Sequence, residues 1–146
     1  MKSPKFYFFD TGVLNAAAKE LNSDLVSGSA RFGRLFEQFI INEFYRMNDY
    51  YMTDYSLSYY STGHSEVDLV LAKGRGSNPI GVEIKSFSKV FQEDLSGLQV
   101  FSSEYPSSKL FCVCTAPKSD TITLGNGNKV SVLPYEEAVR KILIES

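Results

Sequence analysis

Two runs of residues, 66–72 and 80–87, most strongly restrict what this chain can fold into, because each is apolar and strand-like yet carries charged side chains two positions apart. The charged motifs within these runs are Glu66-Val67-Asp68 and Glu83-Ile84-Lys85. Residues two apart in a β-strand point to the same face, so the two charged side chains of each motif are expected to share a face of their strand. If the two strands are neighbours, an acidic cluster and one lysine meet on one side of a sheet.

The overall composition is that of a soluble globular protein. The chain has 146 residues, of which 43% are hydrophobic and 22% charged, and this length fits one domain, residues 1–146, with a full core. Its formal net charge is -2. Domains that bind nucleic acid strongly by themselves are usually basic, so this charge argues against strong autonomous binding and leaves a local basic patch open.

The cysteines and the hydropathy of the chain predict a cytoplasmic protein. Cys112 and Cys114 lie two apart in an apolar run, a spacing that suits reduced core residues better than a disulfide or a zinc site. No apolar stretch approaches the roughly 20 residues needed to cross a bilayer, and no signal-peptide pattern opens the chain.

Hydrophobic periodicity and turn residues predict the order of helices and strands. Strands are expected at 5–9, 56–60, 66–72, 80–87, 109–116, 121–124 and 129–133, and helices at 13–21, 32–47, 93–105 and 134–144. The run Gly125-Asn126-Gly127-Asn128 is typical of a hairpin turn between the last two strands. This order predicts an α/β fold with a mixed central sheet flanked by helices.

One acid on the helix predicted at 32–47 is placed unusually. Glu37 lies at the edge of the apolar stripe, between Ile41 and Phe44, and Gly33 one turn earlier is expected to leave open space beside it. A carboxylate in that position is partly desolvated, so it needs a polar partner or a metal ion.

These residues suggest phosphodiester hydrolysis. The carboxylates of Asp68 and Glu83 and the main-chain carbonyl of Ile84 are oxygen ligands of the kind that bind Mg²⁺, which stabilises the charge on a phosphate and activates water. Lys85 would lie beside the attacking water, and Glu37 would add a ligand or position water. The alternative is a half-exposed sheet in which charged residues form ordinary cross-strand ion pairs.

The order of these motifs resembles the PD-(D/E)XK nuclease superfamily, which has the restriction-endonuclease-like fold. A longer set resembles the C-terminal domain of unknown function found in prokaryotic AAA-type ATPases. This set consists of Lys5-Phe6-Tyr7-Phe8-Phe9-Asp10-Thr11-Gly12, Gly33-Arg34-Leu35-Phe36-Glu37, Glu66-Val67-Asp68-Leu69-Val70 and Glu83-Ile84-Lys85.

The resemblance implies four active-site residues: Glu37, Asp68, Glu83 and Lys85. It also implies Mg²⁺ or Mn²⁺ as cofactor and an ATPase module in the same or another chain. No glycine-rich phosphate loop occurs here, so the chain is expected to be the C-terminal part of a larger ATPase or a separate domain. Gln99, on the helix after the second motif, is a possible substrate contact. The family often has an arginine on the strand before the first motif, where this chain has Tyr59 and Tyr60.

Two functional hypotheses follow. The first is a magnesium-dependent nuclease-like domain that hydrolyses DNA and is associated with an AAA-type ATPase. The second is a catalytically inactive module with the same fold that mediates protein or nucleic-acid interaction. A small-ligand domain is less favoured, because the chain has no glycine-rich phosphate loop. The choice between DNA and RNA, the sequence specificity and the oligomeric state stay open.

Overall fold

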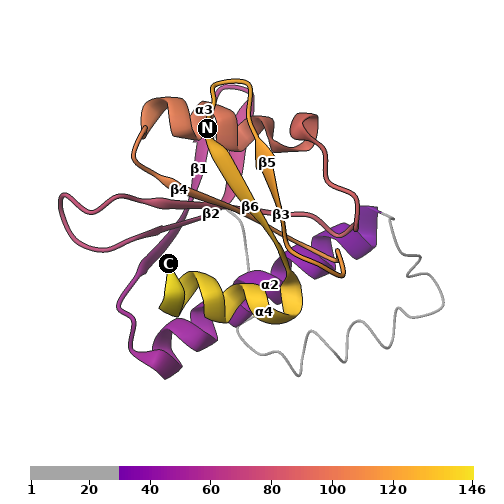
Figure 1. Ribbon diagram of the computed structural model, residues 1–146. Coiled ribbons are helices and arrows are strands. Elements are labelled where there is room, and N and C mark those ends of the chain that lie inside the picture. Colours follow the sequence, from indigo (N-terminus) through magenta and orange to yellow (C-terminus); the bar gives the residue numbers. More distant parts are fainter. Residues whose placement is uncertain (1–29) are drawn as a thin grey trace.

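The computed structural model describes residues 30–146, which form a six-stranded mixed sheet covered by helices on both faces (Figure 1). The strands are β1 (Ser56–Thr62), β2 (Ser65–Ala72), β3 (Ile80–Ile84), β4 (Lys109–Cys114), β5 (Asp120–Thr123) and β6 (Lys129–Pro134). The helices are α2 (Ala30–Tyr51), α3 (Ser96–Glu104) and α4 (Tyr135–Arg140); the short turn η1 (Gln92–Leu95) precedes α3, and η2 (Lys141–Glu145) continues α4. The strand expected at 5–9 and the helix expected at 13–21 lie outside the described residues.

The sheet has the order β1-β2-β3-β4-β6-β5. The first three strands are antiparallel neighbours, β3 runs parallel to β4 and β4 parallel to β6, and β5 closes the far edge antiparallel to β6. The predicted fold class, α/β with a mixed central sheet flanked by helices, is therefore confirmed.

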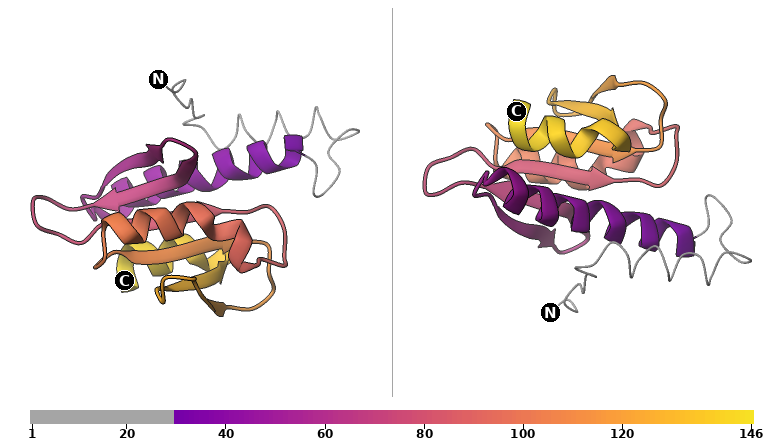
Figure 2. Two further views of the ribbon diagram at one scale, coloured as in Figure 1. Left: turned by 90° about the horizontal axis from the view of Figure 1, so that it is seen from above. Right: turned by 90° about the horizontal axis from the view of Figure 1, so that it is seen from below.

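Two hydrophobic clusters lie on opposite faces of this sheet. Helices α2 and α4 cover one face and α3 covers the other, as the views from above and below show (Figure 2). Strand β3 illustrates the alternation: Ile80, Val82 and Ile84 join the cluster under α2 and α4, whereas Gly81 faces the ring of Phe101 on α3. All five residues of β3 are buried, so this strand is the centre of the fold.

Helix α2 is longer than the 32–47 segment that the sequence predicts. Its apolar stripe supplies four buried core residues, Phe36, Ile40, Ile41 and Phe44. The helix is followed by a turn that Asn48 holds: its amide nitrogen donates to the Tyr55 carbonyl at 3.0 Å, and its amide oxygen accepts from the Tyr55 N–H at 3.0 Å. A polar side chain of the helix therefore fixes the course of the chain between α2 and β1.

The remaining elements follow the predictions closely. The hairpin turn between β5 and β6 contains Gly127 at a φ of 87°, a left-handed conformation that suits glycine. Cys112 and Cys114 are free and fully buried in the cluster under α3, as predicted. None of the helices in residues 30–146 combines the length and the apolar character that crossing a membrane requires.

Strand β3 ends at Ile84, three residues earlier than predicted. The Lys85 N–H still donates to the Val113 carbonyl at 2.9 Å, and the chain then leaves the sheet toward η1. The residues that follow Lys85 therefore form a loop beside the sheet.

A close contact fixes α3 against the sheet next to the first carboxylate motif. A Cβ at Gly97 would lie 1.9 Å from the Glu66 carbonyl oxygen, so only glycine lets the helix approach β2 so closely. The position of α3 against β2 thereby depends on residue 97 being a glycine.

We expect Gly97→Ala to lower the free energy of unfolding by about 2 kcal/mol or more, because the helix must shift away from β2. Thermal and urea unfolding would measure the loss. The matched control is Ser96→Ala at the neighbouring exposed position, which should leave the stability nearly unchanged. Equal stability of the two variants would contradict the close contact.

Candidate functional site

A β-bulge shapes the strand that carries Asp68. Ser58 of β1 pairs with Val70, but Tyr60 pairs with Val67, so β2 contains one extra residue between these pairs. Val67 and Val70 consequently both join the cluster under α3 although they are three positions apart. The uninterrupted two-residue alternation predicted for residues 66–72 is therefore wrong at this point. A bulge of this kind redirects the side chains beside it.

The bulge lies where β2 and β3 part. Their pairing ends at Leu69 and Val82, and beyond it Asp68 Oδ2 accepts a hydrogen bond of 2.8 Å from the Ile84 N–H. The Asp68 carboxylate thus accepts the hydrogen bond that the Ile84 amide would have donated to the backbone of β2 if the strand pairing had continued. Since the N–H and C=O of one strand residue point to the same neighbour, the Ile84 carbonyl lies on the Asp68 side of β3.

Glu83 and Lys85 form an ion pair beside this hydrogen bond. Glu83 is 8% exposed, and its Oε1 lies 3.3 Å from Lys85 Nζ. Burial lowers the pKa of Lys85, but the nearby charges of Glu83 and, more weakly, Asp68 outweigh it, so the pKa lies above its ordinary value. The structure therefore brings together three of the predicted residues, Asp68, Glu83 and Lys85.

Glu37 lies on α2, which packs against the face of the sheet opposite to the one that α3 covers. Beside Gly33 there is room for a Cβ, which would make one ordinary van der Waals contact, at 3.4 Å from Ser86 Oγ. The beginning of α2 thus packs next to the residue that follows Lys85, and Glu37 comes one turn later on the same side of the helix. Its side chain is half-buried.

The acids do not form a ready metal-binding cluster. Within residues 30–146, no group of three or more His, Cys, Asp or Glu side chains is arranged so as to hold a metal ion. The oxygen donors that the sequence proposes for a cation are two carboxylates and one carbonyl, from Asp68, Glu83 and Ile84.

Gln99 has a structural role. Its Oε1 accepts from the Gly125 N–H at 3.0 Å, and its main-chain carbonyl accepts from the Asn126 side chain at 3.2 Å, so α3 holds the turn between β5 and β6. The substrate contact suggested for this residue stays a prediction.

Cys112, expected from the sequence only as a reduced core residue, lies next to the candidate site. Cys112 pairs in register with Glu83 on the parallel strand β4, and it lies close enough to Glu83 and Lys85 for their charges to affect the pKa of its thiol. A hydrogen bond with Cys114 and burial raise the pKa of the Cys112 thiol, which therefore stays neutral and forms an apolar floor. No sequence signal reveals this neighbour, because the register of parallel strands is set by distant packing.

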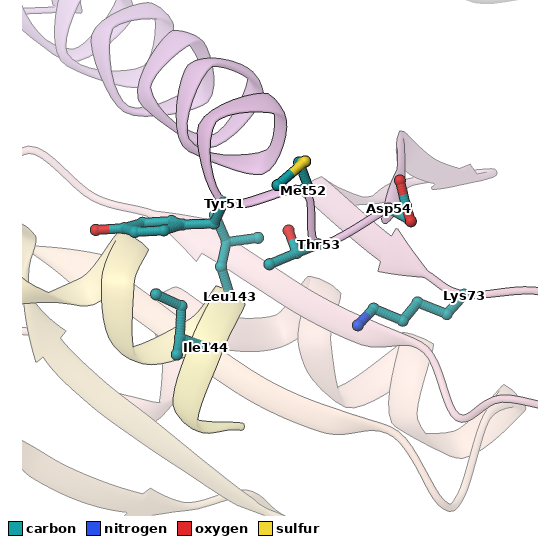
Figure 3. A pocket seen from close by; sticks show the side chains of 7 residues that line it. All are labelled: Tyr51, Met52, Thr53, Asp54, Lys73, Leu143 and Ile144. Atoms are coloured by element: carbon teal, nitrogen blue, oxygen red, sulfur yellow. The ribbon is translucent and has the colours of Figure 1, made fainter.

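A wide hollow of about 540 Å³ lies elsewhere, between the end of α2, the turn after it and η2. Figure 3 shows its lining, which includes Met52, Lys73 and Ile144. None of the predicted site residues lines this hollow, so it does not carry the predicted chemistry.

The fold and the site define a mixed α/β domain with a carboxylate–lysine site at the parting of two central strands. Residues 32–137 match the family described as Domain of unknown function (DUF4143), and the chain belongs to this family. Neither the curated proteins nor the solved structures compared with the chain include a match.

The raised pKa of Lys85 predicts how the stability of the fold and the reactivity of this amine depend on pH. The ion pair stabilises the fold fully below the ordinary lysine pKa of 10.5, and this contribution is lost as the pH rises through the higher pKa of the folded protein. We expect Lys85 to react with an amine-acylating reagent at about pH 9 more slowly than the exposed Lys89, measured by peptide mass spectrometry.

Removing the ion pair supplies the control for this experiment. Glu83→Gln should speed acylation of Lys85 and leave Lys89 unchanged. Equal rates for the two lysines in the unaltered protein would contradict the raised pKa.

Proposed function

We propose that this domain is a metal-dependent nuclease-like module that hydrolyses phosphodiester bonds in DNA and works with an AAA-type ATPase. The observation that carries the proposal is the Asp68 carboxylate held on the Ile84 amide directly beside the Glu83–Lys85 ion pair. In this proposal the domain has the restriction-endonuclease-like fold of the PD-(D/E)XK superfamily and the ATPase association comes from the family resemblance, whereas the cytoplasmic location comes from the cysteines and the hydropathy of the chain.

The donor atoms suit Mg²⁺ or Mn²⁺. Mg²⁺ in proteins is commonly held by one or two carboxylates and keeps several waters, so Asp68 and Glu83 with the Ile84 carbonyl are a sufficient set. When bound, the cation would supply charge stabilisation to the phosphate and a water of lowered pKa.

The residues around the proposed cation site would bind the phosphate, orient the charged side chains and exclude water. Lys85 keeps its proton at neutral pH because its pKa is raised, so it acts as a hydrogen-bond donor to a phosphate oxygen rather than as a base. Glu83 fixes the direction of the Lys85 side chain, and the Ile84 amide fixes that of Asp68. The buried Cys112 below them excludes water, which strengthens these interactions.

Specific observations favour a second candidate, a catalytically inactive module that mediates protein or nucleic-acid interaction. The carboxylates of Asp68 and Glu83 are already engaged by protein groups, and the part of the chain that the structure describes has no three-ligand metal cluster. The net charge of -2 also opposes tight autonomous binding to DNA.

The two candidates differ in DNA cleavage with Mg²⁺ or Mn²⁺. We expect cleavage by the unaltered chain and a loss of about 100-fold or more in Asp68→Asn, Glu83→Gln and Lys85→Met. The first two variants each remove a carboxylate that would hold the cation, and the third removes the hydrogen-bond donor to the phosphate. Glu66→Gln is the matched control: Glu66 lies on the same strand but is exposed, so its removal should change cleavage little.

Calorimetric titration with Mn²⁺ completes the test. Binding to the unaltered protein that Asp68→Asn abolishes would support the nuclease. A folded protein that neither binds the cation nor cleaves single-stranded DNA, duplex DNA or RNA would overturn the first candidate in favour of the second.

A further inference from the structure

A small pocket adjoins the candidate site. It has a volume of about 230 Å³ and lies between the segment that joins β3 to η1 and the segment that joins β4 to β5. Lys89 and Phe91 line it from the first segment and Lys118 from the second, over an apolar floor that includes Ala116, Ile122 and Val132.

The pocket and the candidate site open on the same face of the sheet. Val132 of the pocket floor belongs to the cluster under α3, and Ala116 and Ile122 pack against this cluster. Glu83 points to this face too, because it is two residues from Gly81, which faces Phe101, and it pairs in register with Cys112. The Phe87 carbonyl accepts from the Thr115 N–H at 3.3 Å, so the segment after the site runs along the end of β4 toward the pocket.

The rim of the pocket combines an aromatic ring with cations. Phe91 is 57% exposed, although large apolar side chains are usually buried, and Phe87 on the segment that leads to the pocket is 37% exposed. Lys89 and Lys118 are exposed, and neither has an ion-pair partner within residues 30–146.

The acids near the rim are engaged by the backbone. Asp120 also lines the pocket, and its Oδ1 accepts from the Thr121 N–H at 2.8 Å. Asp94 Oδ2 accepts from the Phe91 N–H at 2.8 Å, while the Asp94 N–H donates to the Phe91 carbonyl at 3.0 Å. These two hydrogen bonds hold the backbone of Phe91 in place, and they thereby fix the position from which its ring extends.

We propose that this surface binds a single strand of nucleic acid, with a base stacked on Phe91 and neighbouring phosphates contacted by Lys89 and Lys118. Exposed aromatic rings alternating with cations are the arrangement by which proteins hold unpaired strands, because every base has a face that can stack. The bases of a duplex are already stacked on each other and cannot reach a ring at the rim of a pocket. The inference rests on the proposed function, since it supplies the strand to Asp68, Glu83 and Lys85.

The test measures fluorescence anisotropy of a labelled oligothymidylate of about 15 nucleotides in EDTA, where no metal-dependent cleavage occurs. We expect binding that weakens about tenfold in Phe91→Ala and is retained in Phe91→Tyr. The double variant Lys89→Ala/Lys118→Ala should also bind more weakly, and its plot of log affinity against log salt should be shallower by about 1.4, the value for two phosphate contacts on a single strand.

Two exposed residues outside the pocket are matched controls. Tyr50→Ala removes an aromatic ring that is 73% exposed, and Lys73→Ala removes an exposed cation, so both variants should bind the oligonucleotide as the unaltered protein does. Equal losses in these controls and in Phe91→Ala would overturn the proposal. Equal affinity for a duplex of the same length would overturn it as well, because a stacked base would then not be needed. No binding by the folded protein would also overturn it and would point to a protein partner instead.

Failure of this inference can be told apart from failure of the proposed function. Oligonucleotide binding in EDTA that needs Phe91, without cleavage when Mg²⁺ or Mn²⁺ is added, would overturn the nuclease and support the strand-binding surface. Cleavage of a single strand with the same KM in Phe91→Ala and in the unaltered protein would overturn the strand-binding surface and support the nuclease.

Discussion

Burial of the whole length of β3 is the constraint on which the rest of the structure depends. A strand at the centre of a sheet with helices on both faces has no solvated side, so its one ionisable residue, Glu83, must be compensated within the fold. Lys85, two residues further along the same strand direction, supplies the opposite charge at 3.3 Å. The ion pair at the candidate site is therefore first a requirement for folding.

The separation of β2 and β3 beyond Leu69 and Val82 brings a second carboxylate, that of Asp68, next to this ion pair. In a continuous ladder the Ile84 amide would be bonded to the backbone of β2, and no side chain would be needed there. Because the pairing stops at Leu69 and Val82, the Asp68 carboxylate takes over that amide and is brought next to the ion pair. The bulge in β2 and the contact of Gly97 with the Glu66 backbone hold this divergence in place.

The candidate site and the small pocket lie near the ends of β3 and β4. Open α/β sheets place their binding sites at the carboxyl ends of parallel strands, because the chain leaves the sheet there and exposes loop residues. Here the loop after Lys85 continues directly into the pocket with Lys89 and Phe91, on the face of the sheet that Glu83 also faces. The candidate site and the proposed strand-binding surface are thus joined by one continuous segment of chain.

The sequence by itself determined the local elements and the residue types of the site. Apolar periodicity predicted α2 and the strands, and Gly125 to Asn128 predicted the hairpin, because these elements depend on neighbours within a few residues. The charged motifs predicted that Asp68, Glu83 and Lys85 would meet on condition that their two strands are neighbours, and the structure meets this condition. Only the tertiary structure decided the bulge beside Asp68, the pairing of Glu83 with Cys112, the contact of Ser86 with Gly33 and the use of Gln99 to hold a turn. These features depend on strand register and on packing between segments far apart in the chain, and local residue patterns carry no information about either.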